Sequence, residues 1–118
     1  MTKKIDLEKK AYQYVKYIHA DQSLKGCKYL IYAIILTMEN PEIHYTGKDG
    51  LYQQTANYFH VQNTGSVERG IRHLCERLYS DTSVEQYEKL FGTMRKITNR
   101  RLISTACNFI RYESEKLQ

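Results

Sequence analysis

The scarcity of helix breakers is the feature that most restricts what this chain can fold into. The sequence contains one proline, Pro41, and only six glycines, while apolar residues recur at helical spacing along most of its length. Strand signals are weak, and there is no repeat, low-complexity tract or linker-like stretch. At 118 residues the chain has the length of one domain. The pattern therefore predicts a single all-α domain over residues 1–118.

Helical periodicity predicts six helices, which span approximately residues 6–19, 23–39, 51–60, 65–79, 83–91 and 99–115. Ser23 is the predicted N-cap of the second helix, because a serine oxygen accepts an unpaired backbone N–H of the first turn. Pro41 ends that helix, since the residue before a proline is pushed out of the helical region. Residues 40–50 then form a loop, and Gly92 is the predicted stop of the fifth helix.

Positive charge is concentrated in the second half of the chain. The net charge is +5; residues 1–68 carry a net +1, residues 69–111 carry +5, and the last seven residues carry −1. Every arginine lies between Arg69 and Arg111. Arginine makes forked hydrogen bonds to phosphate and to guanine edges. This distribution favours nucleic acid as a partner, and a solvated basic face is the alternative.

Several classes of protein are excluded by what the sequence lacks. Its longest apolar run covers residues 29–36, far short of the roughly 20 residues that span a bilayer, and its start lacks the apolar core of a secretory signal. We therefore expect a cytoplasmic protein without a membrane segment. Cys27, Cys75 and Cys107 are well separated, which suits a reducing compartment and places in the core. No phosphate loop, nucleophile elbow, carboxylate pair or metal-ligand spacing occurs, so we expect no enzyme, no cofactor and no metal.

Tyrosines are unusually numerous, with eleven in a chain that has no tryptophan. Tyr12, Tyr14 and Tyr17 lie close together on the predicted first helix. We expect these rings to be buried with their hydroxyls in water. Stacking on unpaired bases is the alternative.

The predicted fourth helix has two different faces. With steps of about 100° per residue, one narrow arc is apolar and holds Val67, Ile71, Leu74, Cys75 and Leu78. The opposite arc of about 140° is polar and holds Glu68, Arg69, Arg72, His73 and Glu76. The charged residues of this polar arc come early in the helix.

The segment before this helix completes a recognisable pattern. A short predicted helix ends at Phe59-His60, an Asn/Thr/Gly turn follows, and two helices joined in this way are typical of a helix-turn-helix. Arginine reaches guanine O6 and N7 with two hydrogen bonds, and glutamate accepts one from cytosine N4. A helix N-terminus with nearby hydroxyls, here that of Thr64, holds a phosphate. On these residues alone, a DNA-reading helix and an ordinary amphipathic surface helix both remain open.

Several short stretches share the motifs of one known family. Residues 66–73 read S-V-E-R-G-I-R-H, close to V-E-R-A-I-R-H, and residues 25–34 read K-G-C-K-Y-L-I-Y-A-I, close to K-G-x-x-Y-L-x-x-A-I. Residues 51–59 read L-Y-Q-Q-T-A-N-Y-F, close to L-Y-x-x-I-A-x-x-F, residues 90–92 read L-F-G as in the family, and residues 96–99 read K-I-T-N, close to K-P-T-N. Over about residues 15–115 the chain thus resembles the effector domain of stage zero sporulation protein A. The resemblance implies a six-helix domain that binds DNA through a helix-turn-helix.

The resemblance also implies roles for individual residues. It implies contacts to base edges from Glu68 and Arg69. It implies contacts near or at the DNA backbone from three further residues: Arg72, His73 and Lys96. Arg100 and Arg101 follow without a counterpart in the family. We expect Arg100 to add to the phosphate contacts, and a solvated side chain is the alternative.

Three departures from the family pattern matter. Ser66 stands where the family has a base-reading arginine, so we place Ser66 among the base-reading residues but expect a different preference there; it is also a candidate N-cap. The turn before it, residues 60–66, is one residue longer. Gly70 replaces an alanine, which costs about 1 kcal/mol of helix propensity. No phosphoacceptor receiver domain is recognisable, and the start at Met1 favours an orphan effector domain over a piece of a longer regulator.

We therefore expect a transcription regulator that binds double-stranded DNA in a sequence-specific manner. The alternative is a protein-interaction module that binds RNA polymerase or a partner regulator and reads DNA weakly. Binding by one copy and binding by a dimer on tandem sites both fit the sequence.

Overall fold

The computed structural model describes residues 2–113, and these residues confirm the predicted all-α class. They form six α-helices, and the last one runs directly into a π-helical turn. The helices are α1 Thr2–Tyr17, α2 Lys25–Glu39, α3 Leu51–Tyr58, α4 Thr64–Asp81, α5 Val84–Phe91 and α6 Asn99–Asn108, and the π-helical turn is Phe109–Glu113. Among the helices described, none combines the length and the apolarity that crossing a membrane requires.

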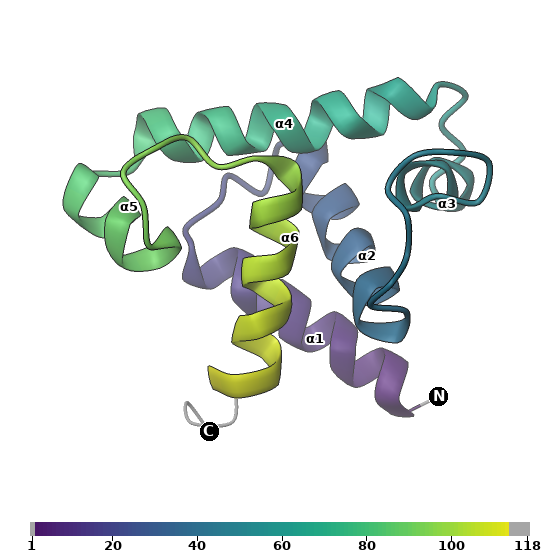
Figure 1. Cartoon of the computed structure of the whole chain (residues 1–118), viewed down its shortest axis with the longest axis horizontal. Helices are drawn as coiled ribbons and strands as arrows, with labels where there is room; N and C mark the ends of the chain where they lie inside the picture. Colours follow the sequence, from purple (N-terminus) through teal and green to yellow (C-terminus); the bar gives the residue numbers. More distant parts are fainter. Residues whose placement is uncertain (1, 114–118) are drawn as a thin grey trace.

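Helix α2 lies at the centre of the fold and packs against α1, α3, α4 and α6. Helix α4 runs along the upper edge of the molecule, and α6 descends from beneath it (Figure 1). Helix α1 crosses the lower part, while α3 and α5 lie near opposite ends of α4 (Figure 1). Among the residues that the structure describes, no helix covers the outer side of α4 (Figure 1).

The core is apolar and draws on every helix. The three cysteines are free, buried thiols, as predicted. Burial raises the pKa of Cys27 and Cys107 to about 11 and that of Cys75 to about 12. The largest fully buried apolar side chains are Tyr14, Ile18, Leu30, Ile34, Leu51, Ile71, Leu74, Leu102 and Ile103.

Two glycines let α2 and α4 approach each other closely. A Cβ atom built on Gly26 would overlap the carbonyl oxygen of Gly70, and one built on Gly70 would lie 2.9 Å from Cδ2 of Tyr29. Tyr29 is only 4% exposed, so its ring has little room to yield. The glycine at position 70 therefore weakens the intrinsic propensity of α4 but makes space for the Tyr29 ring at the crossing.

Helix ends differ from the predictions where local hydrogen bonds compete. The prediction that Ser23 caps α2 is wrong: Leu24 occupies the N-cap position without a side-chain bond, and the Ser23 hydroxyl donates to the Asp21 carboxylate at 2.6 Å. Helix α3 ends before the predicted residue 60, because His60 adopts a left-handed φ of 57°. Gly92 has a φ of 70° and stops α5, as predicted. The predicted end of the last helix lies outside the described residues.

The three tyrosines of α1 do not behave alike. Tyr12 and Tyr17 are 44% and 46% exposed, so the prediction that all three rings are buried holds only for Tyr14. The Tyr14 hydroxyl is not in water either: it is buried and makes no hydrogen bond to the residues described. Tyr14 lies on the face of α1 that also buries Val15 and Ile18, whereas Tyr12 and Tyr17 lie outside that face.

Candidate nucleic-acid interface

Helices α3 and α4 are joined by a tight turn over residues 59–63. The backbone N–H of Val61 donates to the carbonyl oxygen of Ala56 at 2.8 Å, which folds the turn back onto α3. The side-chain oxygen of Asn63 accepts the N–H of Gly65 at 2.8 Å and so caps α4. The pair is compatible with a helix-turn-helix in which α4 is the second helix.

The start of α4 differs from the prediction. The helix begins at Thr64 with Asn63 as its N-cap, so Ser66 is not the cap but a residue of the first turn. The Thr64 hydroxyl donates to Oε1 of Gln53 at 2.6 Å, a bond that ties α4 to α3. Its only hydroxyl hydrogen is thus used within the protein. A phosphate contact from that hydroxyl, as predicted for Thr64, requires this bond to break.

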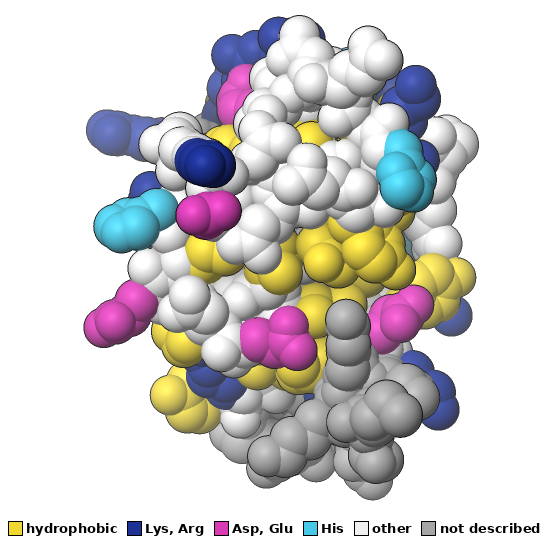
Figure 2. Space-filling model, turned by 90° about the vertical axis from the view of Figure 1, so that its right-hand side faces the viewer, with side chains coloured by type: hydrophobic (Ala, Val, Ile, Leu, Met, Phe, Trp, Pro, Cys, Tyr) yellow, Lys and Arg dark blue, Asp and Glu magenta, His cyan; other side chains and the backbone are white. Residues whose placement is uncertain are grey.

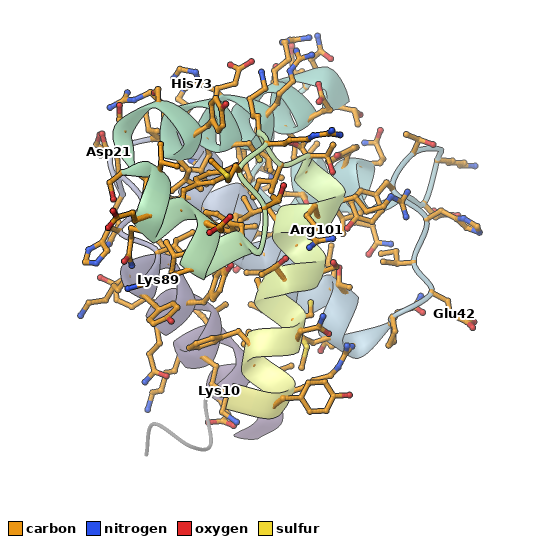
Figure 3. The ribbon with its side chains drawn as sticks, turned by 60° about the vertical axis from the view of Figure 1, so that its left-hand side comes forward. Lys10, Asp21, Glu42, His73, Lys89 and Arg101 are labelled. Carbon is orange, nitrogen blue, oxygen red and sulfur yellow. The ribbon has the colours of Figure 1, made fainter. Side chains whose placement is uncertain are left out.

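The predicted division of α4 into two faces is confirmed. The apolar arc is buried, and it consists of Val67, Ile71, Leu74, Cys75 and Leu78. Four residues of the polar arc are exposed, namely Arg69, Arg72, His73 and Glu76, and Glu68 is half-buried. His73 lies on the outer side of α4 (Figure 3). Viewed from the α3 end of the molecule, Lys and Arg side chains are most frequent toward the upper edge, along which α4 lies (Figure 2).

Arg69 and Ser66 are adjacent on the first turns of α4. The Nη2 atom of Arg69 donates to the Ser66 hydroxyl at 3.5 Å, a long and weak contact between exposed groups. The guanidinium also lies over Gly65, where an added Cβ would be 2.9 Å from Nη1. The side chain therefore folds back toward the N-terminus of the helix, from which it can swing outward at little cost.

Glu68 is held from two sides. Its Oε1 lies 3.6 Å from Nη2 of Arg72, one turn further along α4. Its Oε2 and its backbone carbonyl accept from Nδ2 of Asn99, at 3.4 Å and 3.1 Å. Asn99 is the first residue of α6, so this contact links the polar arc of α4 to a helix far away in sequence.

Lys96 joins the same surface from the segment before α6. Its Nζ lies 3.8 Å from Oε2 of Glu76, and Nδ1 of His73 lies 4.0 Å from Oε1 of the same carboxylate. The pair of Lys96 and Glu76 is about half exposed, and ion pairs of that kind contribute about 0–1 kcal/mol. Lys96 can therefore exchange Glu76 for a phosphate at small cost.

Arg100 is positioned by an aromatic ring. Its guanidinium carbon lies 4.2 Å from the centre of the Tyr45 ring, a cation–π arrangement. Burial raises the pKa of Tyr45 to about 12, although Arg100 opposes the shift, so the ring stays neutral. A groove of about 440 Å³ lies between Tyr45, α4 and the start of α6, and Arg72, Lys96 and Arg100 all line it.

The structure thus brings most of the predicted residues together on one surface. Ser66, Glu68, Arg69, Arg72 and His73 come from α4, and Lys96 and Arg100 come from the segment at the start of α6. We define this set as the α4–α6 surface. Thr64 lies at its edge and faces α3.

Two residues that organise this surface were missed in the sequence. Asn63 is the N-cap that sets where α4 begins, and an Asn before an apolar-periodic stretch is a cap signal. Asn99 is only 8% exposed. It precedes Leu102, Ile103 and Ala106 at helical spacing, so its place on the buried stripe of α6 was available from periodicity.

Among the residues that the structure describes, no group of three or more His, Cys, Asp or Glu side chains could hold a metal ion. The comparison with known families identifies a match over nearly the whole chain. Residues 11–117 match the family model described as sporulation initiation factor Spo0A C terminal.

Proposed function

The chain belongs to the family of Spo0A C-terminal domains, and we propose that it regulates transcription by binding double-stranded DNA in a sequence-specific manner through α4. Members of this family are DNA-binding effector domains of sporulation regulators. The observation that carries the proposal is the α4–α6 surface, where an uncovered polar helix face lies beside a basic segment from α6.

Base reading is assigned to the first half of α4. Arg69 is exposed and makes only a long bond to Ser66, so it is free to donate two hydrogen bonds to guanine O6 and N7. Glu68 presents a carboxylate that accepts from cytosine N4. Ser66 contributes a short hydroxyl beside Arg69, which discriminates less among bases than an arginine in that place would.

Backbone contacts flank the base-reading residues. Arg72 and His73 follow one turn later on the same face of α4, Lys96 approaches from the segment before α6, and Arg100 approaches from the first turn of α6. Cations at these positions neutralise phosphates and fix the register of the recognition helix, without reading sequence themselves. Thr64 is the weakest member of this group, because its hydroxyl already donates to Gln53.

The experiment that tests the proposal is selection of bound duplexes from a random DNA pool, followed by affinity measurements at several salt concentrations. We expect a defined consensus, with the selected duplex bound at least about 10³-fold more tightly than a scrambled one. We also expect affinity to fall steeply with salt for both duplexes, because phosphate contacts release counterions.

One outcome of the selection would contradict the proposal. No enrichment of any sequence, with equal and weak binding to all duplexes, would contradict sequence-specific recognition. It would favour the alternative in which the domain binds RNA polymerase or a partner regulator.

A further inference from the structure

Asn99 is a buried polar residue at the junction of three helices. It begins α6 and is only 8% exposed. Its Nδ2 donates to the Tyr52 hydroxyl of α3 at 3.1 Å and to the carbonyl oxygen of Glu68 in α4 at 3.1 Å. Its Oδ1 lies 3.7 Å from the Cys75 thiol, whose burial keeps it protonated as a donor.

The Asn99 amide has more acceptors than hydrogens. The side-chain nitrogen carries two N–H bonds, yet three oxygens lie within reach: the Tyr52 hydroxyl, the Glu68 carbonyl and Oε2 of Glu68. The contact to Oε2 is the longest, at 3.4 Å. The Glu68 carboxylate therefore shares an amide hydrogen with one of the two nearer acceptors, the Tyr52 hydroxyl or the Glu68 carbonyl. Removing one of these acceptors leaves more of the two hydrogens to the carboxylate.

The consequence concerns the direction of the Glu68 side chain. Arg72 holds Oε1 and Asn99 holds Oε2, which restricts the rotamers of a side chain that is otherwise half exposed. An ionised carboxylate has about four acceptor sites, so two such contacts leave others for a base. Holding a recognition group in its bound direction before binding lowers the entropy cost of association.

We propose that Asn99, which lies outside the recognition helix, is a positioning residue that sets the base preference of Glu68. It acts through hydrogen bonds to the Glu68 carboxylate and backbone, and it does not itself touch the DNA. This inference rests on the proposed function, because it presumes that Glu68 reads a base.

The test compares base preference at single positions of the selected site. The position that Glu68 reads is first identified as the one where Glu68→Ala loses its preference. We expect Asn99→Ala to relax preference at that same position by about tenfold, the size of one base contact of about 1.4 kcal/mol. Preference at the position read by Arg69 should be unchanged. In a Glu68→Ala background, Asn99→Ala should cause no further change in base preference.

Tyr52→Phe separates positioning from a merely structural role. It removes one of the three competing acceptors and leaves the Asn99 hydrogens to Glu68. Both variants disturb the same buried network, so a structural role predicts that they act alike on base preference. Positioning predicts that Tyr52→Phe keeps the preference at the Glu68 position while Asn99→Ala loses it. Asn108→Ala, an exposed change at the other end of α6, is the matched control.

The outcomes of these measurements distinguish failure of the proposed function from failure of the inference about Asn99. If circular dichroism shows that Asn99→Ala does not fold, Asn99→Ser is the second variant. It keeps a small polar side chain that is too short to reach Glu68, and the same relaxation is expected. A parent that selects no site overturns the proposed function. A parent that selects a site, with a folded Asn99 variant that keeps every base preference, overturns the inference alone.

Discussion

At the scale of single residues, the α4–α6 surface combines side chains held in place with side chains free to move. Glu68 is contacted from two sides, by Arg72 at 3.6 Å and by Asn99 at 3.4 Å, and Arg100 lies over the Tyr45 ring. Arg69 and Lys96 make only long contacts, at 3.5 Å and 3.8 Å. The two kinds do not divide by proposed role, since Arg69 and Glu68 are assigned to bases and Lys96 and Arg100 to the DNA backbone.

Lys96→Ala should weaken DNA binding about equally on all sequences. Lys96 is assigned to a phosphate, and the loss of one such contact lowers the slope of log affinity against log salt by about 0.9. Affinities measured on a selected and a scrambled duplex at several salt concentrations check this. Lys16→Ala is the matched control, since Lys16 lies on α1 over the Tyr12 ring. A slope that is the same in Lys96→Ala and in the parent would place Lys96 away from the duplex.

Tyr14→Phe should not destabilise the protein, although Tyr14 is 1% exposed. Its hydroxyl is buried without a partner, and burial raises its pKa, so removing the oxygen relieves a desolvation cost of about 1–3 kcal/mol. Urea unfolding should give an equal or larger free energy of unfolding.

Tyr87→Phe provides the contrast for this prediction. The Tyr87 hydroxyl donates to the carbonyl oxygen of Arg95 at 3.0 Å and accepts from the N–H of Ile97 at 2.9 Å. Its removal should lower the free energy of unfolding by about 1–3 kcal/mol. Equal losses in the two variants would show that the Tyr14 hydroxyl has a partner after all.

At the scale of helices, the position of α4 depends on its close crossing with α2. Gly26 and Gly70 supply that closeness, and Asn99 ties α4 to α6 from the other side. The Asn63 cap and the bond from Thr64 to Gln53 fix where α4 starts relative to α3. The direction in which Arg69 and Glu68 face is therefore set by three helices and not by α4 alone.

Gly26→Ala should destabilise the fold. Its new Cβ would overlap the carbonyl oxygen of Gly70, which is backbone and cannot rotate away. Overpacking of this kind costs about 1–3 kcal/mol, against a gain of about 1 kcal/mol from helix propensity. We expect a net loss in the free energy of unfolding, measured by urea denaturation.

Gly65→Ala is the control for the propensity gain. The nearest atoms to its new Cβ are Nη1 of Arg69 at 2.9 Å and Oδ1 of Asn63 at 3.1 Å, both ends of side chains. The Arg69 side chain can move, whereas Oδ1 of Asn63 is held by its capping bond to the N–H of Gly65. The close approach to Asn63 therefore offsets part of the propensity gain, and Gly65→Ala should be close to neutral. A Gly26→Ala protein as stable as the Gly65→Ala protein would contradict the close crossing.

Helix existence and the two faces of α4 could be predicted from the sequence, because periodicity alone decides them. The starts of α3 at Leu51 and α6 at Asn99 could be predicted as well. The start of α2 could not, because the Ser23 hydroxyl bonds to the Asp21 carboxylate and Leu24 occupies the N-cap position. The contacts of Asn99 could not be predicted either. They join residues 31 and 47 positions apart in the chain, and such pairs are set by the packing angle of the helices, which no local pattern contains. The roles expected of five site residues came from the family motif, namely Glu68, Arg69, Arg72, His73 and Lys96. Thr64 and Arg100 were named without it, and Ser66 departs from it.

At the scale of the whole molecule, one apolar core holds a basic face in place. The core includes three thiols whose pKa values burial raises from 9.0 to about 11 or 12. In the unfolded chain these thiols lose their protons near pH 9, whereas the folded protein keeps them to pH 11 or above. The folded state therefore binds more protons between these limits, and stability falls as pH rises through that window.

The free energy of unfolding should be insensitive to these thiols below about pH 8 and should decline above pH 9. Each thiol contributes up to about 1.4 kcal/mol per pH unit to the decline. Urea unfolding at a series of pH values measures it, and Cys75→Ala should show a shallower decline than the parent. An identical pH dependence in parent and variant would indicate that the Cys75 thiol ionises as readily in the folded protein as in the unfolded chain.

The most direct test of DNA reading by α4 is the affinity of Arg69→Ala for the selected duplex and for a scrambled one. Arg77→Ala is the matched control, because Arg77 lies on the same helix near its C-terminal end, paired with Asp81 at 2.8 Å. We expect Arg69→Ala to lose about 1–3 kcal/mol on the selected duplex and to retain most of its affinity for the scrambled one. Arg77→Ala should leave the ratio of the two affinities unchanged. An Arg69→Ala protein that binds the selected duplex as tightly as the parent would contradict the assignment of α4 as the recognition helix.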